Sequence, residues 1–256
     1  MVEAHKVHPA ADARRVEDEP AFVLHTHPYR ETSAIVEAWT AHHGRVALVA
    51  RGARRARSEL RGTLQAFQPL TLAWMGTREL KTLTRAEWRG GMALPAGSAL
   101  LCAFYLNELL LKLLPREDPH PRLFAGYADA LATLAAGGEQ APLLRSFELA
   151  LLEALGYALD LANEVDGRVP IDAAARYHFA IERGAFRLPA RTDLPGMIVH
   201  GSTLVALATG RFADAATAGE AKRLMRVVLD HHLEARRLFS RRIVQDLQAL
   251  EGEDES

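Results

Sequence analysis

The run AIVEAWT at residues 34–40 and the run VALVAR at residues 46–51 decide the fold of the first part of this chain. Both are rich in the β-branched and aromatic residues that are typical of strands. The segment HHGR at 42–45 between them contains a glycine, which suits the turn of a hairpin. The sequence therefore predicts two antiparallel strands joined by a short connection.

Three further strands are indicated on either side of this hairpin. They cover Ala21–His27, Leu70–Trp74 and Glu79–Trp88. Five short strands within about seventy residues suit a small, partly open barrel of the OB type. The number of strands alone fits an SH3-like barrel equally well.

After Gly90-Gly91 the hydrophobic period becomes helical. Helices are expected over Ser98–Leu114, at Leu123 to Leu134, at Leu143 to Leu155, from a Ser202 cap to Thr209, and from about Gly219 to Leu250. Between the third and fourth of these, Tyr177, Phe179 and Ile181 alternate before Arg183-Gly184, which predicts a hairpin.

We therefore expect an α+β protein with two domains. An N-terminal five-stranded OB-type barrel occupies residues 21–93, and a mostly α-helical domain occupies 94–250, with an irregular or hairpin insert at about 158–196. Residues 1–20 and 251–256 are interpreted as a disordered tail and an acidic tail, because they offer little to bury.

The charge of the chain is distributed unevenly. The formal net charge is -1, but residues 21–90 alone carry 11 Lys and Arg against 5 Asp and Glu. A basic module inside a neutral protein gives an anionic polymer a local footprint. This balance favours a nucleic-acid-binding barrel.

The sharpest local feature is the segment RGARRARSELR at residues 51–61, with five arginines and no lysine. The planar guanidinium group binds phosphate through two hydrogen bonds at once. We expect a mobile, exposed loop that contacts DNA backbone together with neighbouring strand cations. The predicted DNA-binding residues are Arg45, Arg51, Arg54, Arg55, Arg57, Arg61, Lys81 and Arg85.

Several of these features have ordinary alternatives. Lys81 and Arg85 are equally well explained as exposed strand cations. The aromatic side chains of Tyr29, Trp39 and Trp74 suit base stacking, but Trp74 is in phase with buried leucines and is better explained by core packing.

No catalytic or metal site is predicted. The chain lacks the phosphate-binding glycine motifs and the nucleophile elbow, and its one cysteine, Cys102, lies in an apolar run and is interpreted as packed. The eleven histidines include no HExxH pair, so they are interpreted as structural or surface groups. We expect a cytoplasmic protein without enzymatic activity, cofactor, metal or membrane span.

Two basic features lie in the helical half. Lys222, Arg223, Arg226, Arg236, Arg237, Arg241 and Arg242 form a cluster that is interpreted as a solvated helix face. Arg145 opens an apolar helix, where it suits an acidic peptide with an apolar end.

Several short segments follow one another in a specific order and spacing along nearly all of the chain after residue 20. They are AFVLH at 21–25, RETS at 30–33, GRV at 44–46, RGAR at 51–54, ELKTL at 79–83, YLNELL at 105–110, FELAL at 147–151 and LGY at 155–157. In this order and spacing the segments resemble the RecO family of bacterial recombination mediators.

The resemblance implies an OB fold followed by a helical domain, binding of single- and double-stranded DNA, and annealing of complementary strands without ATP. It implies partnership with RecR, with the RecA pathway and with the tail of single-stranded DNA-binding protein, and a nucleoid association. We expect that tail to bind at Leu144, Arg145 and Phe147. Some relatives carry a four-cysteine zinc site, but residues 158–187 contain no cysteine, so no zinc is expected.

A rival hypothesis of another class is a protein adaptor. In that case the helical half would bind partners, and the barrel would bind RNA or have no nucleic-acid role.

Overall fold

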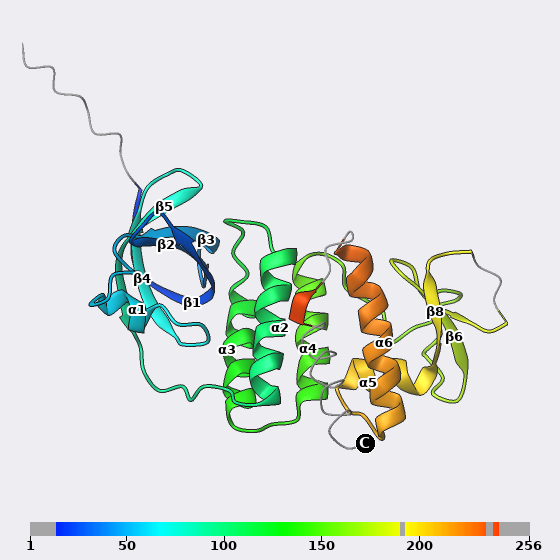
Figure 1. Ribbon diagram of the computed structural model, residues 1–256. Coiled ribbons are helices and arrows are strands. Elements are labelled where there is room, and N and C mark those ends of the chain that lie inside the picture. The colour runs from blue at the N-terminus through cyan, green and yellow to red at the C-terminus, as the bar shows by residue number, and fades with distance from the viewer. Residues whose placement is uncertain (1–13, 190–192, 234–237, 241–256) are drawn as a thin grey trace, which may run out of the picture. The chain divides into compact units, whose positions relative to one another are not determined.

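The computed structural model describes residues 14–189, 193–233 and 238–240, and the chain divides into two compact units (Figure 1). The barrel unit comprises Met1–Gly91 together with Arg116–Pro119. The helical unit comprises Met92–Pro115 and His120–Ser256.

The barrel unit is a closed five-stranded barrel with the strand order β1-β2-β3-β5-β4. The strands are β1 (Arg15–Tyr29), β2 (Ser33–Thr40), β3 (Gly44–Ala50), β4 (Leu70–Met75) and β5 (Leu80–Trp88). Strands β3 and β5 pair in parallel, and a short helix α1 (Glu59–Thr63) lies between β3 and β4 in the chain. The predicted OB-type barrel is confirmed.

The start of β1 corrects the predicted tail. Residues 15–20 are strand, and Arg15 and Val16 pair with Met75 and Trp74 of β4. The strand at 15–20 was not predicted because the segment is rich in charged residues. Glu19 is nonetheless buried, where it accepts a hydrogen bond from the backbone N–H of His42 at 2.6 Å.

The barrel core consists of the inward-facing residues of all five strands. Val36 of β2 pairs directly with Leu48 of the neighbouring strand β3, and Val36, Ala38 and Leu48 all belong to the core cluster and are fully buried. Trp74 is 1% exposed and belongs to the same cluster, so its core role is confirmed.

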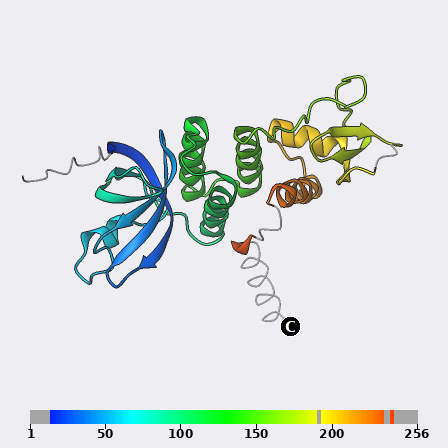
Figure 2. The same ribbon diagram turned by 90° about the horizontal axis from the view of Figure 1, so that it is seen from above.

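Five helices lie within the described residues of the helical unit, and several of them lie side by side (Figure 2). They are α2 (Ser98–Leu113), α3 (Pro121–Ala135), α4 (Gln140–Ala154), α5 (Gly201–Thr209) and α6 (Ala215–His232). The predicted helical domain is thus confirmed, with corrections to its boundaries. Helix α4 begins at Gln140 rather than at Leu143, and α5 begins after His200 without the predicted Ser202 side-chain cap. Helix α6 begins at Ala215 rather than at about Gly219, and the predicted continuation to Leu250 lies outside the described residues beyond 240.

The predicted hairpin is present and carries a third strand that the sequence did not predict. Strands β6 (Arg176–Ala180), β7 (Gly184–Arg187) and β8 (Gly196–His200) form a sheet in the order β7-β6-β8. Tyr177 is fully buried and donates its hydroxyl to Glu164 at 2.9 Å, and Arg187 donates to the same carboxylate.

Candidate nucleic-acid interface

The arginine segment, residues 51–61, leaves the end of β3 and runs through turns into α1. Its five arginine side chains are all exposed: Arg51, Arg54, Arg55, Arg57 and Arg61. Within the part of the chain that the structure describes, none of the five pairs with a carboxylate. These guanidinium groups are therefore available to an external anion.

The segment is held to the turn between β1 and β2. The backbone N–H of Arg54 donates to the carbonyl of Thr32 at 2.9 Å, and its guanidinium donates to the carbonyls of Arg30 at 3.1 Å and Glu31 at 3.4 Å. Ala53 is buried in the barrel core. The predicted exposure is confirmed, but the expected open loop is instead a series of turns followed by a helix.

Arg30 is an additional cation at this position that sequence reasoning did not select. It is exposed and lies over the ring of its neighbour Tyr29, with the guanidinium carbon 5.2 Å from the ring centroid. Its position directly after the predicted strand that ends near His27 was the signal in the sequence that could have identified it. A cation stacked on an aromatic ring keeps its outer edge free for phosphate.

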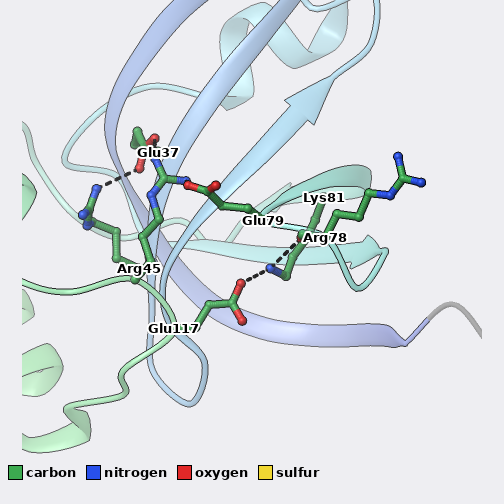
Figure 3. Close-up of polar contacts among 7 residues, drawn as sticks. Glu37, Arg45, Arg78, Glu79, Lys81 and Glu117 are labelled. Carbon is green, nitrogen blue, oxygen red and sulfur yellow. Dashed lines mark hydrogen bonds and ion pairs between the residues drawn. The ribbon is translucent and has the colours of Figure 1, made fainter.

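Arg45 and Lys81 are already engaged by carboxylates (Figure 3). Arg45 donates to Glu37 at 3.1 Å, and burial lowers the pKa of Arg45, a shift that Glu37 opposes only in part. Lys81 is only 8% exposed, and its ammonium pairs with Glu117 and donates to the carbonyl of Arg78 at 3.2 Å. Neither side chain presents a free charge at the surface.

Arg85 is exposed but surrounded by acidic groups. It pairs with Asp18, lies 3.7 Å from Glu17 and lies 3.6 Å from Glu87. The local charge at this end of β5 is therefore negative. The eight predicted contacts thus divide into five exposed arginines without a carboxylate partner among the described residues and three cations that are paired with carboxylates.

Residues Arg116–Pro119 complete the acidic and basic network of the barrel unit. Arg116 pairs with Glu37 at 2.5 Å and with Glu79 at 3.5 Å, and the backbone N–H of Glu117 donates to the carbonyl of Arg45 at 3.0 Å. Figure 3 shows Glu37, Glu79 and Glu117, which come from separate parts of the chain.

The aromatic residues proposed for stacking differ in exposure. Trp39 and Trp74 are buried, so neither can meet a base, whereas Tyr29 is partly exposed. Trp88 of β5, which sequence reasoning did not select, is 61% exposed and donates its indole N–H to Gln68 at 2.8 Å.

The helical unit contains a pocket of about 540 Å³ between α2, α4 and α6. Its apolar lining includes Leu101, Leu144 and Phe212, and its basic lining includes Lys222 and Arg226, which are both exposed. Cations beside leucine and phenylalanine side chains suit an acidic peptide with an apolar residue.

Two details of the predicted peptide site are corrected. Arg145 does not open its helix but lies in its second turn, where it is 8% exposed and paired with Glu148. Phe147 points into the core against Tyr127, with ring centroids 6.2 Å apart, and does not line the pocket. Leu144 and Arg145 do line it, and so do two cations of the basic cluster that the sequence assigned to a solvated face.

Within the described residues, no group of three or more histidine, cysteine or acidic side chains is arranged to hold a metal ion. None of the described helices has both the length and the apolar character needed to cross a bilayer.

Comparison with known sequences covers nearly the whole chain. The family description "Recombination protein O N terminal" matches residues 15–92, and "Recombination protein O C terminal" matches residues 95–242. The match begins at the observed start of β1.

Individual relatives agree with this assignment. The DNA repair protein RecO of Aromatoleum aromaticum is 51% identical over 238 residues, covering 93% of this chain and 98% of the relative. The RecO of Azoarcus sp. is 49% identical over 93% and 98% of the two chains, and that of Nitrosococcus oceani is 49% identical over 92% and 96%. The chain therefore belongs to the RecO family of DNA repair proteins.

Proposed function

We propose that this DNA repair protein acts as a recombination mediator: its barrel binds single- and double-stranded DNA and anneals complementary strands without ATP. With RecR, it then helps to load recombinase onto strands coated by single-stranded DNA-binding protein. Annealing needs no bond chemistry, because screening the phosphates of two strands while leaving base edges free is sufficient.

The division of the barrel's cations carries this proposal. Arg51, Arg54, Arg55, Arg57 and Arg61 are exposed and without carboxylate partners among the described residues, whereas Arg45, Lys81 and Arg85 are neutralised by carboxylates. A polyanion gains most where it meets unpaired guanidinium groups and releases its own counterions. DNA binding is therefore assigned to the arginine segment, with Arg30 beside it.

A salt series on the intact protein tests the assignment. The triple variant R51A/R55A/R57A retains Arg54, whose hydrogen bonds hold the segment in place. It is expected to bind single strands and duplex more weakly and to flatten the slope of log K against log salt. Each lost phosphate contact lowers a single-strand slope by about 0.7.

The matched control is R122A/R168A/R183A, which makes the same change in net charge at exposed arginines of the helical unit. It is expected to keep wild-type affinity and slope. If the barrel variant also binds like wild type, the arginine segment does not hold DNA, and the rival role as a protein adaptor gains support. If the protein prefers RNA to DNA of equal length, the alternative in which the barrel binds RNA gains support.

The pocket of the helical unit is proposed as the dock for the acidic tail of single-stranded DNA-binding protein. The tail's carboxylates would meet Lys222 and Arg226, and its apolar residue would lie against Leu144 and Leu101. Arg145 lines the pocket as well, but its charge is already paired with Glu148.

Charge reversal at the rim tests this dock without disturbing the buried pair. K222E/R226E should abolish binding of a fluorescent acidic peptide with an apolar last residue, while DNA binding by the barrel is unchanged. Arg223 is equally exposed on α6 but does not line the pocket, so R223E serves as the control. Normal peptide binding by K222E/R226E would place the dock elsewhere.

A further inference from the structure

Strand β1 carries three rings on one outer face of the barrel. His25, His27 and Tyr29 follow each other at every second residue, so their side chains share a face and repeat about every 6.6–6.8 Å along the strand. Both histidines are exposed and Tyr29 is partly exposed. The rings of His25 and His27 lie against each other, with centroids 4.2 Å apart. We call these three side chains the ring face.

The strand register places the ring face beside the arginine segment. His27 pairs with Ile35 of β2, and Ile35 pairs with Val49 of β3, so these side chains form one row across the sheet. The next row begins with Tyr29 paired to Ser33 and approaches Arg51 just beyond the end of β3. Ile35 and Val49 are partly exposed, so the row continues as an apolar strip on the outside of the barrel.

The surroundings of His25 disfavour its charged form. Burial, followed by repulsion from His27, lowers the pKa of His25, and Glu37 opposes this shift only in part. Uncharged rings make poor phosphate ligands but can stack on the flat face of any base. The adjoining arginines supply the phosphate contacts that the rings do not.

We propose that His25, His27 and Tyr29 form a stacking surface for the unpaired bases of a single strand whose phosphates lie on the arginine segment. The inference rests on the DNA binding proposed above and adds a distinction between DNA forms. A duplex keeps its bases stacked inside and meets only the arginines. A single strand meets both the arginines and the rings.

The experiment compares binding of oligo-dT and of a duplex of equal length by the intact protein at pH 8, where imidazolium is scarce. Removing a stacking side chain costs about 1 kcal/mol or more per base, which corresponds to at least about fivefold in affinity. H25A/H27A should therefore lose at least about fivefold on oligo-dT and less than about twofold on duplex. H25F/H27F keeps the rings without a titrating group and should bind oligo-dT within about twofold of wild type.

H178A/H231A removes two histidines of the helical unit and should change neither affinity. Three results overturn the inference: H25A/H27A binds oligo-dT like wild type, it loses single strand and duplex equally, or H25F/H27F loses as much as H25A/H27A. Failure of the underlying DNA-binding proposal looks different, because R51A/R55A/R57A would then bind both DNA forms like wild type.

Discussion

Lys81 of β5 directs its ammonium group at the carboxylate of Glu117, which lies 36 residues later in the chain. The two partners differ in their surroundings. Lys81 is almost fully buried, whereas the side chain of Glu117 is about half exposed. Loss of one partner therefore has a different consequence from loss of the other.

We expect E117Q to destabilise the protein more than K81M. The Gln side chain leaves a buried ammonium without its counter-charge, at a cost of about 1–2 kcal/mol. K81M leaves a carboxylate that water can reach, at a cost of below about 1 kcal/mol. Urea unfolding measures both changes in the free energy of unfolding. K81M should also leave the salt dependence of DNA binding intact, and a flatter slope would show that Lys81 contacts phosphate after all.

Gly44 is expected to tolerate no side chain. Its φ is +66°, and a Cβ there would lie 2.5 Å from backbone atoms of Asp118. G44A should lower the free energy of unfolding by at least about 2 kcal/mol, because positive-φ strain and a backbone clash act together. Gly62 offers a control within helix α1, since a Cβ there meets nothing within 4 Å. G62A should leave stability unchanged or raise it slightly, and an equal loss in both variants would contradict this account.

The stability of the helical unit should depend on the protonation of His232. Its ring stacks on Tyr157 with centroids 4.1 Å apart, and burial, then His231, lowers the pKa of His232 below 6.5. As pH falls below about 6.5, the unfolded chain binds this proton first, so the folded state loses stability. H232F keeps a stacked ring without the proton, and its thermal midpoint should fall less than that of wild type between pH 7.5 and pH 5.5. If the thermal midpoints of H232F and wild type fall equally between pH 7.5 and pH 5.5, protonation of His232 does not control the stability of the helical unit.

Cys102 should react slowly with alkylating agents. It lines the pocket beside Gln140, and burial raises the pKa of its thiol, so little thiolate exists at pH 7.5. Alkylation by iodoacetamide, followed by mass spectrometry, should be slower than that of a free small thiol and should accelerate as pH rises. An acidic peptide bound at Lys222 and Arg226 should protect the cysteine. Equal rates with and without saturating peptide would argue against occupation of the pocket.

The barrel was largely predictable from the sequence, because β2 and β3 are rich in the β-branched and aromatic residues that are typical of strands. Val36 and Ala38 belong to the core cluster and Ile35 is partly exposed, in agreement with the register of the paired strands. The early part of β1 was not predictable. Glu19 is charged, and its burial depends on contacts with the backbone N–H and ring of His42 and with the ring of His43, which meet it only after folding.

The arginine segment was found because its density of guanidinium groups is a property of local sequence. The neutralisation of Arg45 and Lys81 was not visible, since their partners Glu37 and Glu117 meet them only after folding. Only part of the pocket lining was predictable from the sequence. Arg145 was selected for its isolation among apolar residues, whereas Lys222 and Arg226 come from a helix that follows about eighty residues later.

The membership of Arg116–Pro119 in the barrel unit affects the order in which this protein can mature during synthesis. A ribosome that has released residues 15–91 has supplied every strand of the barrel, yet Lys81 still lacks Glu117 and Glu37 still lacks Arg116. Those partners emerge only after the whole of α2. A nascent chain halted before residue 116 should therefore have all five strands but lack two of the ion-pair partners of the barrel. A gene fragment that ends after β5 should accordingly yield a barrel that is less stable than that of the full chain.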